Sequence, residues 1–131
     1  MTQNETLRPY ERIKDPADFR RAFDRRRSVS DDLLIVYGVE NGLDHPRLGI
    51  SVSRKKVRRA TARNRIKRLI REAFRLAKSE LPPGIDLVVL PRGRDLTFAA
   101  ARESLGTLAR DLSRRLKVPP RRVTPPGGPD S

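Results

Sequence analysis

Apolar residues recur along the chain at helical spacing in three regions. Steps of three and four positions run through 61–81, and a shorter stripe occupies 15–25. A third stripe covers 97–116, with Thr97 as its N-cap. The dipeptide Asp15-Pro16 is a typical helix start, because Asp caps the first turn and Pro suits its backbone. The pattern therefore predicts three helices, each with one apolar face.

Between these helices lie segments with the character of strands. Residues 33–39 form a continuous apolar run rich in Ile and Val, which predicts a strand covered on both faces. Residues 47–53 alternate, with apolar side chains on one face and Gly or Ser on the other. That face of small residues leaves room for another group to approach the backbone. Further strands are predicted at 85–92 and, shorter, within 25–31.

The predicted order is helix, three strands, helix, strand, helix (αβββαβα). It indicates an α+β domain, in which a small mixed sheet and its packed helices form a two-layer sandwich. The strand–helix–strand unit that ends at 85–91 would ordinarily be right-handed. Residues 1–14 lack periodicity and are expected to form an N-terminal arm before a single domain at 15–117. Residues 118–131 are rich in Pro and Gly and are expected to be a disordered tail.

Length and composition narrow the class of protein. A chain of 131 residues suits one domain with its own core. Cysteine is absent, which excludes a disulfide framework and thiolate metal sites and fits a reducing compartment. No apolar run is long enough to span a membrane, and residues 1–10 lack the apolar stretch of a signal peptide. These features favour a cytoplasmic protein.

The positive charge is concentrated in one segment. The chain carries 30 Lys and Arg against 16 Asp and Glu, a net charge of +14. Residues 54–75 contain 11 of the basic residues and a single acid, Glu72, so this segment supplies +10 of that charge. A basic balance of this size points to a polyanion, with nucleic acid as the first candidate and an anionic membrane as the second.

The helix predicted at 61–81 divides its surface between two functions. Its apolar residues fall within an arc of roughly 140° at about 100° per residue. A neighbouring arc carries Asn64 and almost only positive charge, whereas Arg65 projects on its own. The alternative is a merely solvated face, but such a face would mix Glu with Lys. Arg63 and Arg65 lie near the positive end of the helix dipole, at a cost of about 0.3–1 kcal/mol each, so they point to a phosphate ligand.

The sequence of this helix also resembles a known family. Arg63-Asn64-Arg65 followed by "IKRLIREAF" is similar to the RNR signature of the bacterial ribonuclease P protein family. The preceding "GISVSRKKV" resembles the strand and basic loop of that family, "DFRRAF" its first helix and "LIVYGV" its aromatic-containing strand. The resemblance covers about residues 12–113. Two departures are Arg58, where the family often has Gly, and the absence of the usual Gly within 25–27.

The resemblance implies a basic αβ sandwich with an uncommon left-handed crossover, which overrides the right-handed default. It implies the protein subunit of an endoribonuclease whose catalytic RNA removes the 5′ leader of precursor tRNA. The partners are then that RNA and the single-stranded leader. Mg²⁺ is used by the RNA-based active site, so no catalytic residue and no bound metal are expected in the protein.

The resemblance also assigns residues to the two partners. The side expected to face the catalytic RNA comprises Arg63, Asn64, Arg65, Lys67, Arg68 and Arg71, with Arg54, Lys55 and Lys56 of the preceding loop. The cleft expected to take the leader comprises Phe19, Phe23, Tyr37, Ser51 and Arg12. From spacing alone, Phe19 and Phe23 fit a core position better than a cleft, and both alternatives stay open here.

Other functions compete with this interpretation. No self-contained active site is visible: His45 is the only histidine, the serines lack a base partner, and Asp31-Asp32 is typical of a solvated turn. A plain RNA-binding scaffold without a role in cleavage would share the basic helix. A membrane-binding helix would need an exposed apolar face, yet here strands are available to cover that face.

Overall fold

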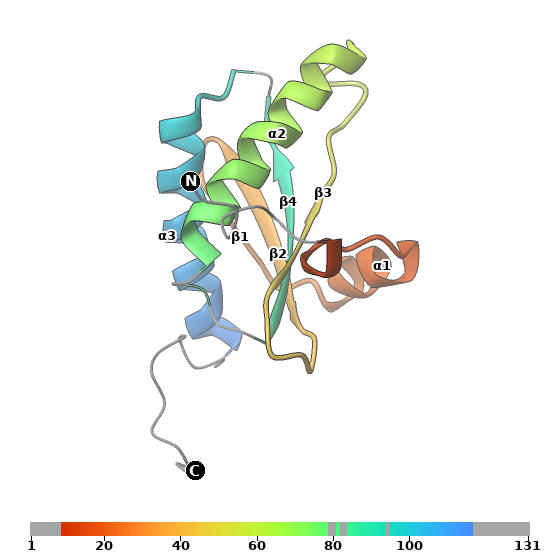
Figure 1. Ribbon diagram of the computed structural model, residues 1–131, viewed down its shortest axis with the longest axis vertical. Helices are drawn as coiled ribbons and strands as arrows, with labels where there is room; N and C mark the ends of the chain where they lie inside the picture. Colours follow the sequence, from red (N-terminus) through yellow and green to blue (C-terminus); the bar gives the residue numbers. More distant parts are fainter. Residues whose placement is uncertain (1–8, 79–80, 82–83, 94, 117–131) are drawn as a thin grey trace.

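The computed structural model describes residues 9–78, 81, 84–93 and 95–116 of the chain. Within these residues, the helices and strands follow the predicted order after the short 3₁₀ helix η2 (Figure 1). The elements are η2 (Pro9–Glu11), α1 (Pro16–Arg25), β1 (Ser28–Ser30), β2 (Leu34–Glu40), β3 (Arg47–Ile50), α2 (Ala60–Ala77), β4 (Ile85–Pro91) and α3 (Phe98–Leu116). The predicted α+β class and its element order are therefore confirmed.

The four strands form one mixed sheet in the order β1-β2-β4-β3. β2 pairs antiparallel with β1 and with β4, and Tyr37 lies opposite Val88 in this register. β3 pairs parallel with β4, which places Gly49 beside Val88 on the other side. Two parallel neighbours require a crossover, and α2 supplies it. The left hand expected for this crossover stays a prediction.

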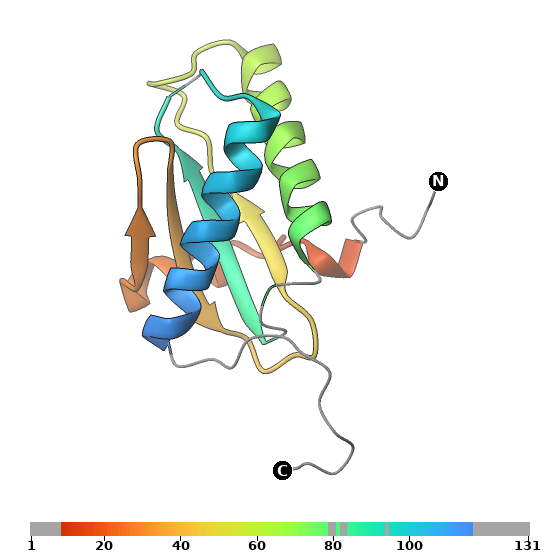
Figure 2. The same ribbon diagram turned by 90° about the vertical axis from the view of Figure 1, so that its left-hand side faces the viewer.

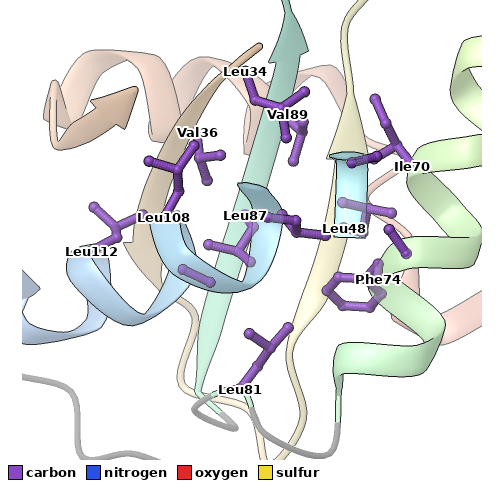
Figure 3. Close-up of a cluster of buried hydrophobic side chains, with 14 of the residues drawn as sticks. Leu34, Val36, Leu48, Ile70, Phe74, Leu81, Leu87, Val89, Leu108 and Leu112 are labelled. Atoms are coloured by element: carbon purple, nitrogen blue, oxygen red, sulfur yellow. The ribbon is translucent and has the colours of Figure 1, made fainter. Parts of the chain in front are cut away.

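The main core lies between the sheet and the pair α2 and α3, which cover the same face (Figure 2). Side chains of β2, β3 and β4 meet those of the two helices there, as Figure 3 shows for Leu87 and Phe74. The apolar stripe predicted for α2 is buried, because Ile66, Ile70 and Phe74 have no exposed surface. Burying side chains of this size stabilises the fold by roughly 1.5–3 kcal/mol each.

α1 packs on the opposite face of the sheet, behind the strands in Figure 2. Ala22 of α1 is buried there against Val39 and Val88, with aromatic residues at the margin. β2 is therefore covered on both faces, as its apolar sequence predicts. The arrangement also has a partial third layer, which the predicted two-layer sandwich did not include.

Residues 9–14 belong to the folded domain, so the predicted arm is wrong for this part of 1–14. β3 is an edge strand, and its free edge accepts a parallel bridge between Arg12 and Leu48. The Ile13 amide donates to the Leu48 carbonyl at 2.9 Å, and the Ile13 side chain is buried. Residues 1–8 and the predicted tail at 118–131 lie outside the described residues.

Two predicted boundaries also need correction. α2 ends at Ala77 rather than at Leu81, because Leu81 turns back into the core, where it is 1 % exposed. β3 ends at Ile50 rather than at residue 53, since the chain leaves the sheet after the Ser51 amide has donated to Val89. No helix in the described part of the chain is long and apolar enough to cross a membrane.

Candidate nucleic-acid interface

The start of α2 concentrates positive charge. Its N-cap residue is Arg59, whose extended backbone begins the helix without a side-chain hydrogen bond to the first turn. The first turn contains no acidic residue. The first amide groups of a helix point outward with the positive end of its dipole, so this end favours an anion.

Arg63 connects the helix to the basic loop that precedes it. Its Nη1 donates to the carbonyl oxygens of Val57 at 3.0 Å and Arg58 at 2.7 Å. Val57 is 2 % exposed, so these bonds fix a loop that already has one buried anchor. Arg63 was predicted to face RNA; the structure also gives it this positioning role.

The basic loop presents its charged side chains outward. Ser53 begins it, because its carbonyl accepts the Val57 amide at 2.9 Å and its hydroxyl accepts the Lys56 amide at 3.3 Å. The side chains exposed on this turn are those of Arg54, Lys55 and Lys56. Arg58 needs no glycine-like backbone, because Arg26 is the only non-glycine with positive φ among the described residues. The departure from the family pattern at Arg58 is therefore compatible with an ordinary backbone.

The predicted signature residues differ in exposure. Asn64, Arg65 and Arg68 are exposed, whereas Lys67 and Arg71 are half-buried. Burial and the neighbouring charges of Arg12 and Arg68 lower the pKa of Arg71 below its ordinary value. A half-buried guanidinium among like charges is stabilised when an anion joins it.

A pocket of about 120 Å³ joins the two groups of predicted site residues. It is lined by Arg12, Ile13, Phe19, Leu48, Gly49, Ile50, Lys67 and Arg71. Phe19 and Arg12 were assigned to the leader cleft, and Lys67 and Arg71 to the face that meets the catalytic RNA. The structure therefore places an aromatic ring and three cationic groups around a single hollow.

Gly49 makes the close approach of Phe19 possible. A Cβ atom at position 49 would lie 2.8 Å from Phe19 Cε1 and Cζ, and 3.3 Å from Ile13 Cβ. The room predicted over the small residues of β3 is thus partly filled by Phe19 itself. The ring therefore rests directly on the backbone of β3, and Lys67 and Arg71 of α2 also line the pocket.

Phe23 and Tyr37 form the other aromatic contact on this face of the sheet. Their ring centroids are 4.9 Å apart at an interplanar angle of 85°, an edge-to-face arrangement. Three aromatic side chains are half-buried against the cluster around Ala22, namely those of Phe19, Phe23 and Tyr37. Their exposure is therefore intermediate between that expected for a core position and that expected for an open cleft. Phe23, Tyr37 and Ser51 do not line the pocket, although Ser51 directly follows β3.

Sequence reasoning missed the polar group that holds α1 against the sheet. Asp86 of β4 is fully buried, and its carboxylate accepts hydrogen bonds from Arg47, Asn41 and Arg21. Its signal was an acid inside the apolar segment "IDLVVL". A buried carboxylate needs such partners, so the basic residues near it could have been sought.

The remaining polar candidates, Asp31 and His45, make structural contacts. Asp31 Oδ1 accepts the amides of Leu33 and Leu34, and Oδ2 accepts the hydroxyl of Ser104. His45 Nδ1 lies 2.9 Å from Asp44 Oδ1, and its ring packs edge-on against Tyr10 at 5.1 Å. These contacts give Asp31 and His45 positions in loops rather than in a shared site.

Comparison with known proteins decides the family. A family model described as Ribonuclease P matches residues 7–113. The chain belongs to the Ribonuclease P family. The resemblance drawn from Arg63-Asn64-Arg65 and its flanks is therefore confirmed.

Individual members of the Ribonuclease P family agree closely in length and fold. The ribonuclease P protein component of Photorhabdus laumondii is 44% identical over 101 residues, which cover 76% of this chain and 84% of the relative. The ribonuclease P protein component of Clostridioides difficile is 40% identical over 101 residues, which cover 75% of this chain and 88% of the relative. The RNase P protein of Thermotoga maritima superposes with a TM-score of 0.68 at 38% identity, covering 76% and 96% of the two chains. That of Staphylococcus aureus gives 0.67 at 39%, covering 82% and 96%.

Proposed function

We propose that this chain is the protein subunit of a ribonucleoprotein ribonuclease P that removes the 5′ leader from precursor tRNA. The catalytic RNA would carry the phosphodiester hydrolysis, and the protein would bind this RNA and the leader. We expect the subunit to act in the cytoplasm. Membership of the Ribonuclease P family supports assembly with a catalytic RNA. The interface described above supports separate contacts with that RNA and with the leader.

The pocket between Phe19 and Arg71 is the observation that carries the proposal. Single-stranded nucleic acid is bound by aromatic faces for its bases and by cations for its phosphates. Phe19 supplies such a face beside Gly49, and the guanidinium groups of Arg12 and Arg71 lie on the rim. A leader lying along this hollow would contact both α1 and α2.

The exposed cationic side chains of α2 and of the basic loop are the proposed contact with the catalytic RNA. Asn64, Arg65 and Arg68 combine amide and guanidinium donors, which suit phosphate, sugar and base edges. Lys55 and Lys56 extend the same positive surface. Association through such contacts is driven by counterion release and weakens as salt rises.

We place Mg²⁺ in the RNA-based active site of the assembled enzyme. The described residues contain no group of three or more His, Cys, Asp or Glu that could hold a metal ion. In the proposed mechanism the protein binds and orients RNA, and it lowers repulsion between the two RNAs by adding positive charge. Hydrolysis itself is assigned to the RNA and its metal ions.

Reconstitution tests the proposal. The full chain is added to a bacterial RNase P RNA at low magnesium, and leader release from precursor tRNA is followed. We expect the protein to stimulate release, because it adds contacts to leader and RNA. The matched control is a precursor tRNA whose 5′ leader is too short to reach the pocket around Phe19. The protein should stimulate cleavage of this control less than cleavage of the full-length precursor. If the chain binds the RNA without stimulating release, a scaffold role without cleavage replaces this proposal.

A further inference from the structure

A second pocket lies on the other flank of α2, where this helix meets the start of α3. Its volume is about 430 Å³, within the range of sites for small ligands. The lining residues are Arg65, Arg68, Leu69, Glu72 and Phe98. The pocket shares no residue with the hollow around Phe19, so it is a separate feature of the surface.

The helical positions place the two pockets on opposite sides of one cationic ridge. At about 100° per residue, Lys67 and Arg65 project roughly 160° apart around the axis of α2. Asn64 and Arg68 project between them. A polynucleotide backbone that follows this ridge can therefore direct bases to either flank. Arg65, which the sequence pattern left apart from the cationic arc, acquires a place at the second pocket.

The wall of this pocket combines an aromatic ring with aliphatic surface. Phe98 is the first residue of α3, whose first turn is fixed by the Thr97 hydroxyl accepting the Ala100 amide at 3.2 Å. Phe98 and Leu69 are half-buried, and both pack against the main core. Part of the ring is thus held rigidly while another part faces the pocket, as a stacking surface requires.

The one acid in the pocket is already engaged. Glu72 accepts hydrogen bonds from Arg75, with Arg75 Nε at 3.1 Å from Oε1 and Nη2 bound to Oε2. This pairing lowers the pKa of Glu72 and keeps its carboxylate turned to a cation. With this acid engaged, the exposed guanidinium group of Arg68 makes the pocket favourable for an anionic ligand.

We infer that this pocket holds one unpaired nucleotide of the catalytic RNA, with its base against Phe98 and its phosphate at Arg68. The inference rests on the proposed function and adds a nucleotide site on the α3 side of α2. An apolar peptide side chain would contact Phe98 and Leu69 but would make no use of the exposed guanidinium group of Arg68. A nucleotide uses both parts of the pocket. The leader is the other possible source of such a nucleotide, and the experiment below separates the two.

The first test compares Phe98→Leu with Phe98→Tyr. Leu keeps apolar volume against the core but removes the aromatic face, whereas Tyr keeps that face. Affinity for RNase P RNA without substrate is measured at fixed salt and magnesium. We expect Phe98→Leu to weaken binding at least about fivefold, the effect of losing one stacked base, and Phe98→Tyr to keep wild-type affinity. Circular dichroism on both variants checks that the fold is retained.

Each outcome has a separate meaning. If the wild-type chain binds the RNA and Phe98→Leu binds equally well, the nucleotide site is wrong while the proposed function stands. If Phe98→Leu alters only the affinity for leader-bearing precursor tRNA, the site belongs to the substrate and the inference is also wrong. If the wild-type chain fails to bind the RNA, the proposed function itself fails.

A second measurement keeps Phe98 intact and remains valid if Phe98→Leu does not fold. The chain has no cysteine, so Ala99→Cys creates a unique attachment point for a photo-crosslinker beside the pocket. Thr107→Cys is the matched control, exposed on the same helix and away from the pocket. In the reconstituted complex we expect the probe at 99 to crosslink to an unpaired nucleotide of the catalytic RNA, and the probe at 107 not to do so. Crosslinks from 99 to the leader alone, or to no RNA, would overturn the inference.

Discussion

Arg47 binds the buried carboxylate of Asp86 through two hydrogen bonds, Nε to Oδ1 at 2.8 Å and Nη2 to Oδ2 at 2.6 Å. Asn41 donates to Oδ1 at 2.8 Å, and Arg21 of α1 donates to Oδ2 at 3.4 Å. One carboxylate of β4 therefore connects α1 with β3. Because α1 carries Phe19, this contact fixes where the aromatic wall of the proposed leader site lies.

Asp86→Ala is expected to lower the free energy of unfolding by about 3–5 kcal/mol, because it breaks the ion pair between the fully buried carboxylate and the partly buried Arg47. Urea denaturation measures the loss. Asp18→Ala is the control, since Asp18 contacts the same two arginines at 3.5 and 3.7 Å but is partly exposed. The loss from Asp18→Ala should stay within about 1 kcal/mol. Similar losses in the two variants would show that the buried carboxylate of Asp86 contributes no more to stability than the partly exposed carboxylate of Asp18.

Gly49→Ala is expected to displace Phe19, because the added Cβ would lie 2.8 Å from two atoms of its ring. We expect a loss of stability of about 1–3 kcal/mol and a larger loss of affinity for leader-bearing precursor tRNA than for mature tRNA. Gly38→Ala is the matched control: its Cβ would meet Leu112 of α3, in the core on the other face of the sheet. Both variants should lose stability, but only Gly49→Ala should alter leader binding. If Gly49→Ala reduces the affinity for the two tRNAs by the same factor, Phe19 is not part of the leader site.

The elements of this fold were largely predictable because their signals are local. The N-cap at Asp15, the apolar run of β2 and the stripe of α3 each depend on residues close in sequence. The predictions that failed concern residues whose positions depend on contacts with residues distant in the sequence. Residues 9–14 carry no periodicity and are ordered by the free edge of β3, and Leu81 leaves the helix to fill the core.

The candidate site shows the same division. The charge of α2 is visible in the sequence, whereas the hollow joining Phe19 to Arg71 depends on the close approach of α1 to Gly49. The contact between Phe98 and the flank of α2 depends on how two helices pack. Periodicity locates each face of a helix, but it does not reveal which other element lies beside it.

Arg26→Gly is expected to stabilise the domain. Arg26 ends α1 in the left-handed region, with φ 57° and ψ 24°, and its amide donates to the Phe23 carbonyl at 3.1 Å. A side chain in this region costs roughly 1–2 kcal/mol, which glycine avoids, so we expect a gain of up to about 1 kcal/mol after the added chain entropy. Thermal unfolding measures it. Arg25→Gly, one residue earlier at the last helical position, has no left-handed strain to relieve and should instead cost up to about 1 kcal/mol. A loss in both variants would contradict the role of the left-handed cap.

Asp31 is expected to make stability fall at acid pH. Burial raises the pKa of Asp31, but hydrogen bonds from Ser104, Leu34 and Leu33 and the charge of Arg92 outweigh burial and lower it. Because the pKa of Asp31 is lower in the folded protein, its ionised carboxylate stabilises the fold at pH values above the unfolded pKa of about 3.9. This stabilisation is lost as the pH falls through the folded pKa of Asp31. Urea denaturation between about pH 6 and pH 2 follows this loss. Asp31→Asn keeps an acceptor without the titration, so its curve should be flatter than that of the wild type below about pH 4. Parallel curves would assign the acid sensitivity to other groups.

Arg68→Gln is expected to reduce the salt dependence of RNA binding. Each phosphate contact changes the slope of log K against log salt by about 0.7–0.9, so losing one should reduce the slope by about that amount. Affinity for RNase P RNA is measured from about 50 to 200 mM monovalent salt at constant magnesium. Arg110→Gln removes the same charge from an exposed position on α3 and should leave the slope close to that of the wild type, because Arg110 lies outside the proposed interface. If the two variants change the slope equally, Arg68 acts only through net charge and makes no phosphate contact of its own.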